Sequence, residues 1–306
     1  MALGILCPGQ GAQHPQMLAP LAGDAAAGAV LASAAAVLGR APAELLRERP
    51  DDLFRNALAQ PLLCAVELAT WAALRTRLPA PRACAGYSVG ELAAYACAGA
   101  LDADELVRLA VRRAELMDLA CAEPSGLVAV RGLTQRPLAA LCAAHGVTIA
   151  IINDADRCVV GGRRAELDAF ATAARAAGGA LTPLCVSVAS HTPLLQPAAE
   201  AFAATLAASG LRAPLVPVLA GIDGAPVYDR ARAVDSLARQ IAHTVDWAAC
   251  LDGLVEAGCR VLLELGPGSG LARMARERHP ELAVRAVDEF RSLDGVVAWV
   301  ERQLQG

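Results

Sequence analysis

The N-terminal part of the chain alternates short apolar runs with longer stretches rich in alanine and leucine. Residues 1–8 are apolar and lead into the glycine-rich sequence PGQGAQ, which predicts a strand followed by a turn. The Ala- and Leu-rich stretches up to about residue 78 predict helices. A second run of small residues at 83–86 predicts another strand, and a sharp turn at 86–90 leads into a predicted helix at 89–99. Strands followed by helices in this way indicate an α/β protein.

The pattern changes between residues 126 and 188. It predicts four strands and two helices in the order β-α-β-β-α-β, which is typical of a ferredoxin-like unit. The predicted strands are 126–132, 148–152, 158–162 and 180–188, and the predicted helices are 134–145 and 163–177. We therefore expect a small ferredoxin-like subdomain at 126–188, inserted into a large α/β-hydrolase-like subdomain formed by residues 1–125 and 189–306.

The larger unit resumes after residue 188. Predicted helices lie near 194–209, 233–243 and 246–257, and predicted strands lie at 215–219 and 260–266. The sequence GPGSG then turns the last of these strands into a final helical region.

Composition and charge exclude several classes of function. The net charge of −4 and the lack of basic runs argue against a nucleic-acid partner. The ten cysteines are scattered and the five histidines stand far apart, so we expect free thiols and no metal site. The apolar stretch 57–74 is interrupted by Gln60, Pro61 and Glu67, so no transmembrane helix is predicted. The N-terminus lacks the basic and apolar segments of an export signal, and we expect a cytoplasmic protein.

Ser88 is the first candidate for chemistry. It lies in the sequence GYSVG, between a predicted strand and a predicted helix, which is the setting of a nucleophile elbow. The flanking glycines allow the backbone to bend there without Cβ clashes. The same pattern also occurs in ordinary strand-to-helix turns, so Ser88 is either a nucleophile or a turn residue.

Arg113 is the anomaly of the next helix. The sequence DADE predicts the helix start, with Asp102 as N-cap and Glu105 completing a capping box. The apolar stripe of that helix contains Leu106, Leu109 and Met117, and Arg113 falls on the same stripe. Because an unpaired buried charge is very unfavourable, Arg113 must either pair with an internal carboxylate or bind an anionic ligand.

His191 is the candidate base. It follows the last predicted strand of the inserted unit, at the junction between the two units. A histidine before a helix is often a capping or surface residue, but a serine nucleophile needs a base with a pKa near neutrality.

Five motifs together resemble the malonyl-CoA:acyl carrier protein transacylases and the acyltransferase domains of polyketide synthases. The resemblance covers nearly the whole chain, in order and in spacing. The motifs are PGQGAQ at 8–13, GYSVGE at 86–91, RRAELM at 112–117, ASHTPLLQP at 189–197 and LELGPGSGLARM at 263–274.

The resemblance implies a role for each candidate residue. Ser88 would attack the thioester of malonyl-CoA, and His191 would transfer protons in a ping-pong reaction. The backbone N–H groups of Gln10 and Val89 would form the oxyanion hole, and Arg113 would bind the free malonyl carboxylate through two parallel hydrogen bonds. No cofactor is implied beyond the CoA of the substrate and the phosphopantetheine of the carrier protein. The partner would be an acyl carrier protein, and the family indicates a monomer.

Two positions depart from the family pattern. Tyr87 stands where the family has a histidine, and Asp246 stands near a position where the family has Gln or Asn that helps to orient the catalytic histidine. Asp246 could orient His191, or it could cap the helix that follows it. Both departures resemble a subgroup associated with the epsilon subunit of malonate decarboxylase, which charges the carrier subunit of that complex.

Three alternatives to a free-standing malonyl transferase follow. The malonate decarboxylase subunit has the same chemistry and differs only in its carrier protein. A thioesterase or esterase would use the same serine and histidine, although it needs no buried arginine. A non-catalytic scaffold would be expected to have lost Ser88 or His191, and neither is lost.

Overall fold

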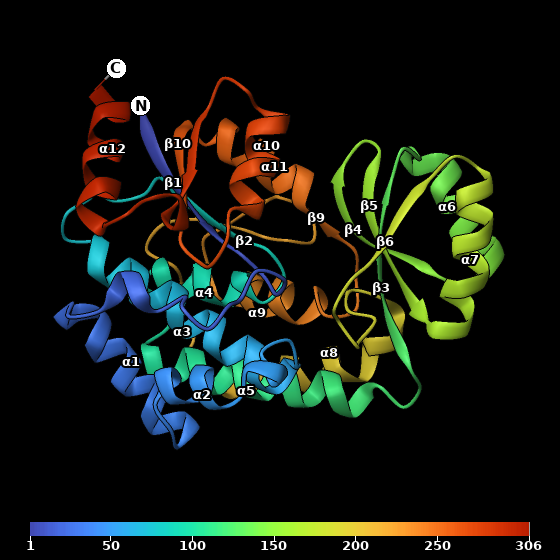
Figure 1. Ribbon diagram of the computed structural model, residues 1–306, viewed down its shortest axis with the longest axis horizontal. Helices are drawn as coiled ribbons and strands as arrows, with labels where there is room; N and C mark the ends of the chain where they lie inside the picture. Colours follow the sequence, from blue (N-terminus) through green and yellow to red (C-terminus); the bar gives the residue numbers. More distant parts are fainter. Residues whose placement is uncertain (306) are drawn as a thin grey trace.

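The computed structural model describes residues 1–305 and contains two β-sheets with helices packed against each. Figure 1 shows the larger unit with the chain termini on one side and the smaller unit, built around residues 125–183, on the other. The predicted mixed α/β fold class is confirmed. The division into subdomains at residues 125 and 189 stays a prediction.

The large sheet has six strands in the order β11-β10-β1-β2-β7-β8. Strands β1, β2, β7, β10 and β11 run parallel, and β8 pairs antiparallel with β7 at the edge. The strands are β1 Ala2–Cys7, β2 Ala83–Gly86, β7 Val218–Leu219, β8 Pro226–Val227, β10 Cys259–Glu264 and β11 Ala283–Ala286. Ile5 of the central strand β1 is in register with Cys84 of β2 and Leu263 of β10. The carboxyl ends of β1 and β2 therefore meet at the same edge of the sheet.

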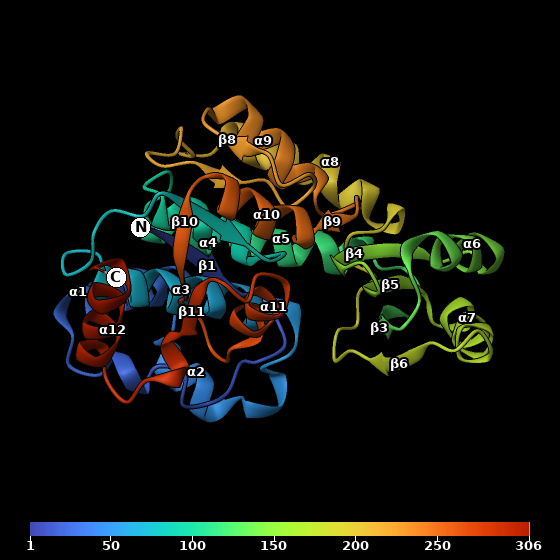
Figure 2. The ribbon, with the colours of Figure 1, turned by 90° about the horizontal axis from the view of Figure 1, so that it is seen from above.

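Helices cover both faces of this sheet (Figure 2). Alternation along β1 explains why: Leu3 and Ile5 are buried against α3, α4, α5, α8 and α12, whereas Leu6 is buried against α10 and α11. The helices of this unit are α1 Ala25–Leu38, α2 Pro42–Glu48, α3 Asn56–Leu74, α4 Gly90–Cys97, α5 Ala103–Ala120, α8 Gln196–Ala208, α9 Arg230–Arg239, α10 Trp247–Glu256, α11 Gly270–Arg278 and α12 Leu293–Gln305.

Helix α3 is long and apolar enough to span a membrane by composition alone. However, 89% of its most apolar 18-residue window is buried inside the protein, where it packs against α1, α4 and α5. Its burial on all sides is that of a core helix.

The small sheet has the strand order β6-β3-β5-β4, with the short strand β9 added at its edge. The four strands β3–β6 pair antiparallel, and β9 pairs parallel with β4. The elements are β3 Ser125–Arg131, α6 Gln135–His145, β4 Thr148–Asp154, β5 Arg157–Arg163, α7 Arg164–Ala176, β6 Ala180–Pro183 and β9 Val245–Asp246. Helices α6 and α7 lie on the side of the sheet away from the large unit (Figure 1), and Leu138 and Phe170 fill the space between.

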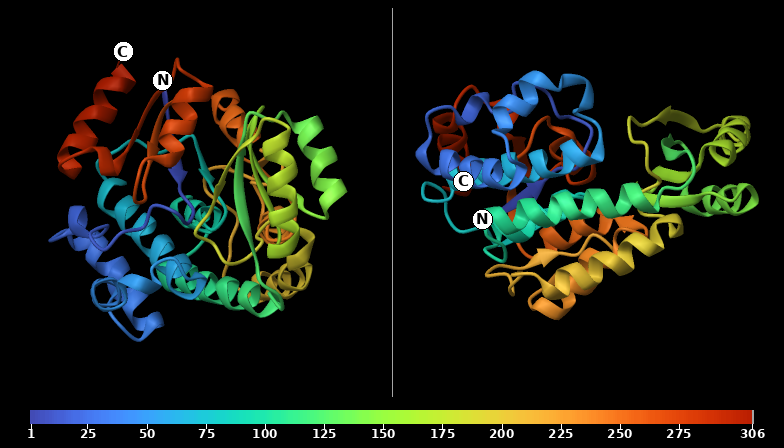
Figure 3. Two further views of the ribbon diagram at one scale, coloured as in Figure 1. Left: turned by 45° about the vertical axis from the view of Figure 1, so that its right-hand side comes forward. Right: turned by 90° about the horizontal axis from the view of Figure 1, so that it is seen from below.

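Helix α5 leads directly into this unit, as the right-hand view of Figure 3 shows. The chain returns after β6, and residues 245–246 then reach across to pair with β4. The two units are therefore joined by two chain crossings and by a shared sheet edge.

Most predicted elements are present, and three expectations are wrong. The strand predicted to extend to residue 188 ends at Pro183, although the N–H of the next residue, Leu184, still donates to the carbonyl of Leu127 at 3.0 Å. The strand predicted at 215–219 is reduced to Val218–Leu219.

The third error concerns the predicted capping box. Asp102 does precede α5, but its carboxylate pairs with Arg212 at 2.9 Å and makes no cap. Glu105 accepts instead from the N–H of Gly210 at 3.0 Å. Both carboxylates are therefore used in tertiary contacts that the local pattern cannot show.

Candidate active site

Ser88 lies in a strained turn between β2 and α4. Its φ is 56°, and within residues 1–305 only His191 shares this property among non-glycine residues, with φ of 62°. The flanking glycines are required by close contacts: a Cβ on Gly86 would lie 2.2 Å from the N atom of Glu91, and one on Gly90 would lie 2.1 Å from the carbonyl oxygen of Cys7. Such strain persists where the surrounding structure imposes it, and it is typical of a nucleophile elbow.

His191 contacts Ser88 directly. Its Nε2 lies 2.8 Å from Ser88 Oγ, and its Nδ1 hydrogen-bonds the carbonyl oxygen of Gln240. Because a carbonyl oxygen can only accept, Nδ1 carries the proton and Nε2 is left to accept from the serine hydroxyl. The backbone N–H of His191 also donates to the carbonyl of Ile241 at 2.8 Å, which holds the residue in its positive-φ conformation.

His191 is uncharged at neutral pH. Burial, and to a smaller extent the positive charge of Arg113, lower its pKa to about 3, against a raising effect of the hydrogen bond to the Gln240 carbonyl. A neutral imidazole is the form that can take a proton from serine.

Arg113 is 1% exposed and is held by neutral groups. Its guanidinium donates to Gln60 Oε1 at 2.8 Å, to Gln240 Oε1 at 3.2 Å and to Ser88 Oγ at 3.4 Å. Within residues 1–305 it forms no ion pair with a carboxylate. Burial lowers its pKa to about 10, so it is still charged at neutral pH. The internal carboxylate partner left open by the sequence does not occur, and the arrangement is that of a cation awaiting an anionic ligand.

The glycine-rich loop after β1 packs against the serine turn. A Cβ on Gly9 would lie 2.7 Å from the carbonyl oxygen of Tyr87 and 3.5 Å from Ser88 Cβ. Gln10 follows Gly9 in this loop and Val89 follows Ser88, so the two residues expected to form the oxyanion hole belong to the two segments that meet at the serine turn.

A cavity of about 370 Å³ opens beside this turn, between the two sheets. It reaches Gln10 and Tyr87 from the large unit and Asn153 and Leu184 from the small unit. Tyr87 donates from its hydroxyl to Asn153 Oδ1 at 3.1 Å, so the residue that replaces the family's histidine bridges the two walls.

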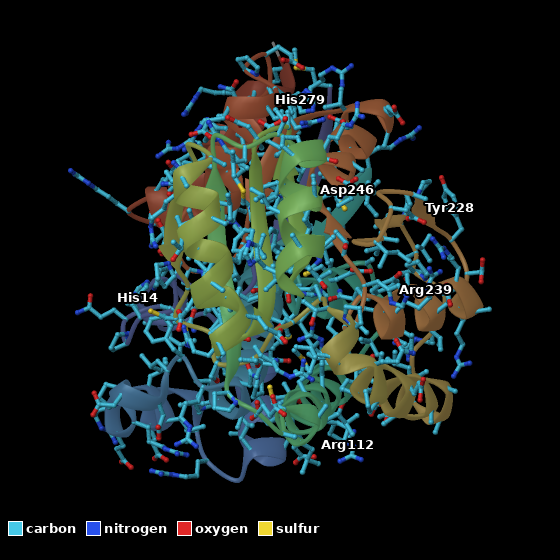
Figure 4. All side chains as sticks on the ribbon, turned by 90° about the vertical axis from the view of Figure 1, so that its right-hand side faces the viewer. His14, Arg112, Tyr228, Arg239, Asp246 and His279 are labelled. Carbon is cyan, nitrogen blue, oxygen red and sulfur yellow. The ribbon has the colours of Figure 1, made fainter. Side chains whose placement is uncertain are left out.

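Asp246 does not orient His191. Its carboxylate accepts from the N–H of Ala249 at 2.9 Å and caps α10, which confirms the capping alternative. Figure 4 shows Asp246 beside α6, at the edge of the small unit. The contact to Nδ1 comes from the Gln240 carbonyl instead. Arg112, the neighbour of Arg113, is exposed on the outside of α5 and pairs with Glu115 (Figure 4).

Three buried residues of the site were missed from sequence. Gln60, Glu91 and Gln240 are each at most 1% exposed, and all three belong to one hydrogen-bond network with Arg113 and Ser88. A polar residue inside an otherwise apolar helix was a signal for Gln60. No local pattern marks Gln240.

Comparisons with known proteins agree on one family. Residues 5–289 match the family described as the acyl transferase domain. The malonyl CoA-acyl carrier protein transacylase of Salmonella typhimurium is 31% identical over 95% of this chain and 97% of its own length. That of Mycobacterium bovis is 34% identical over 95% of this chain and 98% of its own.

Solved structures extend the agreement to the fold. An acyl carrier protein S-malonyltransferase from Vibrio cholerae matches 97% of this chain and 100% of its own with a TM-score of 0.91 and 32% identity. A malonyl-transacylase solved in complex with a holo acyl carrier protein of a type II polyketide synthase matches 97% of this chain and 99% of its own with a TM-score of 0.93 and 29% identity. The chain therefore belongs to the acyl transferase domain family.

Proposed function

We propose that this protein transfers a malonyl group from malonyl-CoA to the phosphopantetheine thiol of an acyl carrier protein. The observation that carries the proposal is the buried guanidinium of Arg113, which pairs with no carboxylate among residues 1–305 and lies 3.4 Å from Ser88 Oγ. A substrate attached to Ser88 that itself ends in a carboxylate supplies the missing charge. Relatives that span nearly the whole chain are malonyl transacylases, which supports the same substrate.

In the first half-reaction, Ser88 Oγ attacks the thioester carbonyl carbon of malonyl-CoA. The hydroxyl proton moves to His191 Nε2, 2.8 Å away. The oxyanion accepts from the backbone N–H groups of Gln10 and Val89, and losing one such donor typically costs about 3–4 kcal/mol of transition-state stabilisation. The carbon–sulfur bond then breaks, and the CoA thiolate takes the proton from His191. The products are malonyl-Ser88 and free CoA.

In the second half-reaction, the thiol of the carrier protein's phosphopantetheine gives its proton to His191 and attacks the Ser88 ester. The carbon–oxygen bond of the ester breaks, and Ser88 Oγ recovers the proton from His191. Malonyl is then attached to the carrier protein and the enzyme is regenerated, so the kinetics are ping-pong. No cofactor takes part in either step.

Selectivity for malonyl over acetyl groups follows from Arg113. A planar guanidinium binds a carboxylate through two parallel hydrogen bonds, which lysine cannot reproduce. Acetyl-CoA would leave the buried charge unpaired, so we expect discrimination on the order of a hundredfold or more. A simple esterase would gain nothing from this arginine, which favours transfer over the hydrolase alternative.

The carrier protein can belong to fatty acid or polyketide synthesis or to a malonate decarboxylase complex. The site chemistry is common to all three, so the carrier protein decides among them. Monomeric state and cytoplasmic location stay predictions.

Intact-mass spectrometry tests the proposal. The protein is mixed separately with malonyl-CoA and acetyl-CoA, and the experiment is repeated with Ser88→Ala and Arg113→Ala. We expect a malonyl adduct that is absent in Ser88→Ala, and a malonyl preference that is lost in Arg113→Ala. Release of CoA without an adduct would indicate a hydrolase, and neither an adduct nor CoA release would overturn the proposal.

A further inference from the structure

Glu91 is a fully buried carboxylate that the reaction above does not use. It is the second residue of α4, three positions after Ser88, and is 0% exposed. Its Oε2 accepts from the N–H of Gly221 at 3.0 Å and from Gln240 Nε2 at 2.8 Å. Its Oε1 has no hydrogen-bond partner within residues 1–305. Burying a carboxyl group with one oxygen unsatisfied is unfavourable, which indicates that Glu91 has a function at this position.

Gln240 connects Glu91 to Ser88, Arg113 and His191. Its amide nitrogen donates to Glu91 Oε2 and, at 3.0 Å, to the carbonyl oxygen of Ser88. Its amide oxygen accepts from Arg113 at 3.2 Å. Its backbone carbonyl accepts from His191 Nδ1. One residue thus sets the position of the guanidinium and the orientation of the imidazole.

The amide of Gln240 satisfies this network in only one orientation. Glu91 Oε2 already accepts from Gly221, and the Ser88 carbonyl can only accept, so the amide nitrogen must face both of them. The amide oxygen then faces Arg113. In the reversed orientation an NH₂ group would face the guanidinium, donor against donor, and the oxygen would face two acceptors.

We infer that Glu91 is a positioning residue for substrate selection: it holds the Gln240 amide so that an oxygen, and not an NH₂ group, faces Arg113. This inference rests on the proposed function, because the fixed guanidinium is what aligns with the malonyl carboxylate. Glu91 acts through Gln240 and does not touch the substrate.

The surroundings of Glu91 leave this role intact at neutral pH. The charged and titratable groups that act on it or are affected by it are Arg113 of α5, Asp223 after β7, Tyr95 of α4 and Cys250 of α10. Burial raises the pKa of Glu91 to about 7, although its hydrogen bonds and Arg113 oppose the rise. When the proton binds, it goes to the free Oε1, because Oε2 already accepts two hydrogen bonds. The acceptor that holds Gln240 is therefore kept in both states.

The test compares Glu91→Leu with Glu91→Gln. The leucine removes the acceptor, whereas the glutamine amide oxygen can replace Oε2 with its NH₂ in the place of the free Oε1. For each variant, kcat and KM are measured for malonyl-CoA and acetyl-CoA, with folding checked by circular dichroism. In Glu91→Leu we expect kcat/KM for malonyl-CoA to fall about tenfold, mainly through KM, with little change for acetyl-CoA. Glu91→Gln should stay within about threefold of the wild type.

The matched control is Glu67→Gln, at a buried glutamate of α3 whose carboxylate has no partner within residues 1–305. It should leave the malonyl-to-acetyl ratio unchanged. Gln240→Met serves as a second variant if Glu91→Leu does not fold: it removes the amide but keeps the backbone carbonyl, and should lower the same ratio.

Two results would overturn the inference: an equal fall for both substrates in Glu91→Leu, which is the mark of a merely structural residue, or an unchanged ratio in Gln240→Met. Failure of the proposed function is a separate result, namely wild-type protein that forms no malonyl adduct at Ser88.

Discussion

Tyr87 and Asn153 join the two units of the protein immediately beside the serine turn. The Tyr87 hydroxyl donates to Asn153 Oδ1 at 3.1 Å, and the Tyr87 ring packs edge-on against Trp247 with 5.4 Å between centroids. Tyr87→Phe removes the hydrogen bond and keeps the ring. We expect the free energy of unfolding, measured in urea, to fall by about 1 kcal/mol. Because both residues line the cavity, KM for malonyl-CoA should rise more than kcat falls.

The control for this change is Tyr228→Phe, at a tyrosine that is 65% exposed. It should alter neither the free energy of unfolding nor the KM for malonyl-CoA. A Tyr87→Phe variant as stable as the wild type would show that the two units are held together without this contact.

The strain at Ser88 predicts a gain in stability when the serine is lost. Ser88→Gly can adopt the φ of 56° without a Cβ clash, so we expect the free energy of unfolding to rise by about 1 kcal/mol while acyl-enzyme formation is abolished. Ser88→Ala abolishes the adduct too but keeps the Cβ and should show no such gain. Thermal unfolding of the two variants separates the strain from the hydroxyl group, and equal melting temperatures would contradict the strain.

Arg113 should contribute to the pH dependence of the base, in addition to the larger effect of burial. Its charge contributes to lowering the pKa of His191 to about 3, so acylation by acetyl-CoA in the wild type should not fall between pH 8 and about 5. In Arg113→Leu the pKa of His191 should rise from about 3, while burial still holds it below the ordinary value of 6.5, and the rate should fall at a higher pH than in the wild type. The exposed neighbour provides the control, since Arg112→Leu should keep the wild-type profile.

The lowered pKa of His191 also makes the stability of the protein depend on pH. Between pH 6.5 and about 3, His191 is protonated in the unfolded chain but stays neutral in the folded protein. Its contribution to the free energy of unfolding is therefore complete above pH 6.5 and is lost as the pH falls toward 3. Urea unfolding across this range should show a weaker pH dependence in His191→Gln than in the wild type. An identical dependence would mean that His191 is not buried in its neutral form.

Asp246→Ala tests the capping assignment. Losing the bond to the N–H of Ala249 should lower the free energy of unfolding by about 1 kcal/mol and leave kcat unchanged. Asp246→Ser, which can still cap the helix, should recover most of the stability. A large fall in kcat in the alanine variant would instead restore Asp246 as a residue that orients His191.

Arg131 and Arg273 are candidates for binding the phosphates of CoA, at the end of the substrate away from the thioester. Both line the cavity that reaches Tyr87, and neither forms an ion pair within residues 1–305. Arg273→Ala should raise KM for malonyl-CoA several-fold, because CoA carries phosphates that an arginine can bind. KM for a malonyl-pantetheine thioester, which lacks those phosphates, should not change. Equal effects on both substrates would exclude phosphate binding by Arg273.

The sequence by itself determined the elements and the candidate side chains. Periodicity is local, so the strands at 83–86 and 126–132 and the helices between them follow from the pattern of apolar residues. The requirement for glycine at position 86 is also local, because a Cβ there would meet the backbone of Gly90 and Glu91, whereas glycine is required at position 90 by the distant carbonyl of Cys7. Arg113 was identified because a charged side chain on the apolar face of a helix is unfavourable unless a partner or a ligand pairs with it.

Only the tertiary structure decided what these side chains contact. Arg113 meets Gln60 and Gln240, which are 53 and 127 residues away along the chain, and His191 meets a backbone carbonyl 49 residues away. A backbone carbonyl leaves no trace in a side-chain pattern, so the sequence could offer only Asp246, as one of two alternatives, for a role that Gln240 fills. Asp102 and Glu105 show the same limit, since local propensity predicts a cap wherever its residues occur, whereas packing brings up distant partners that compete for the same carboxylates.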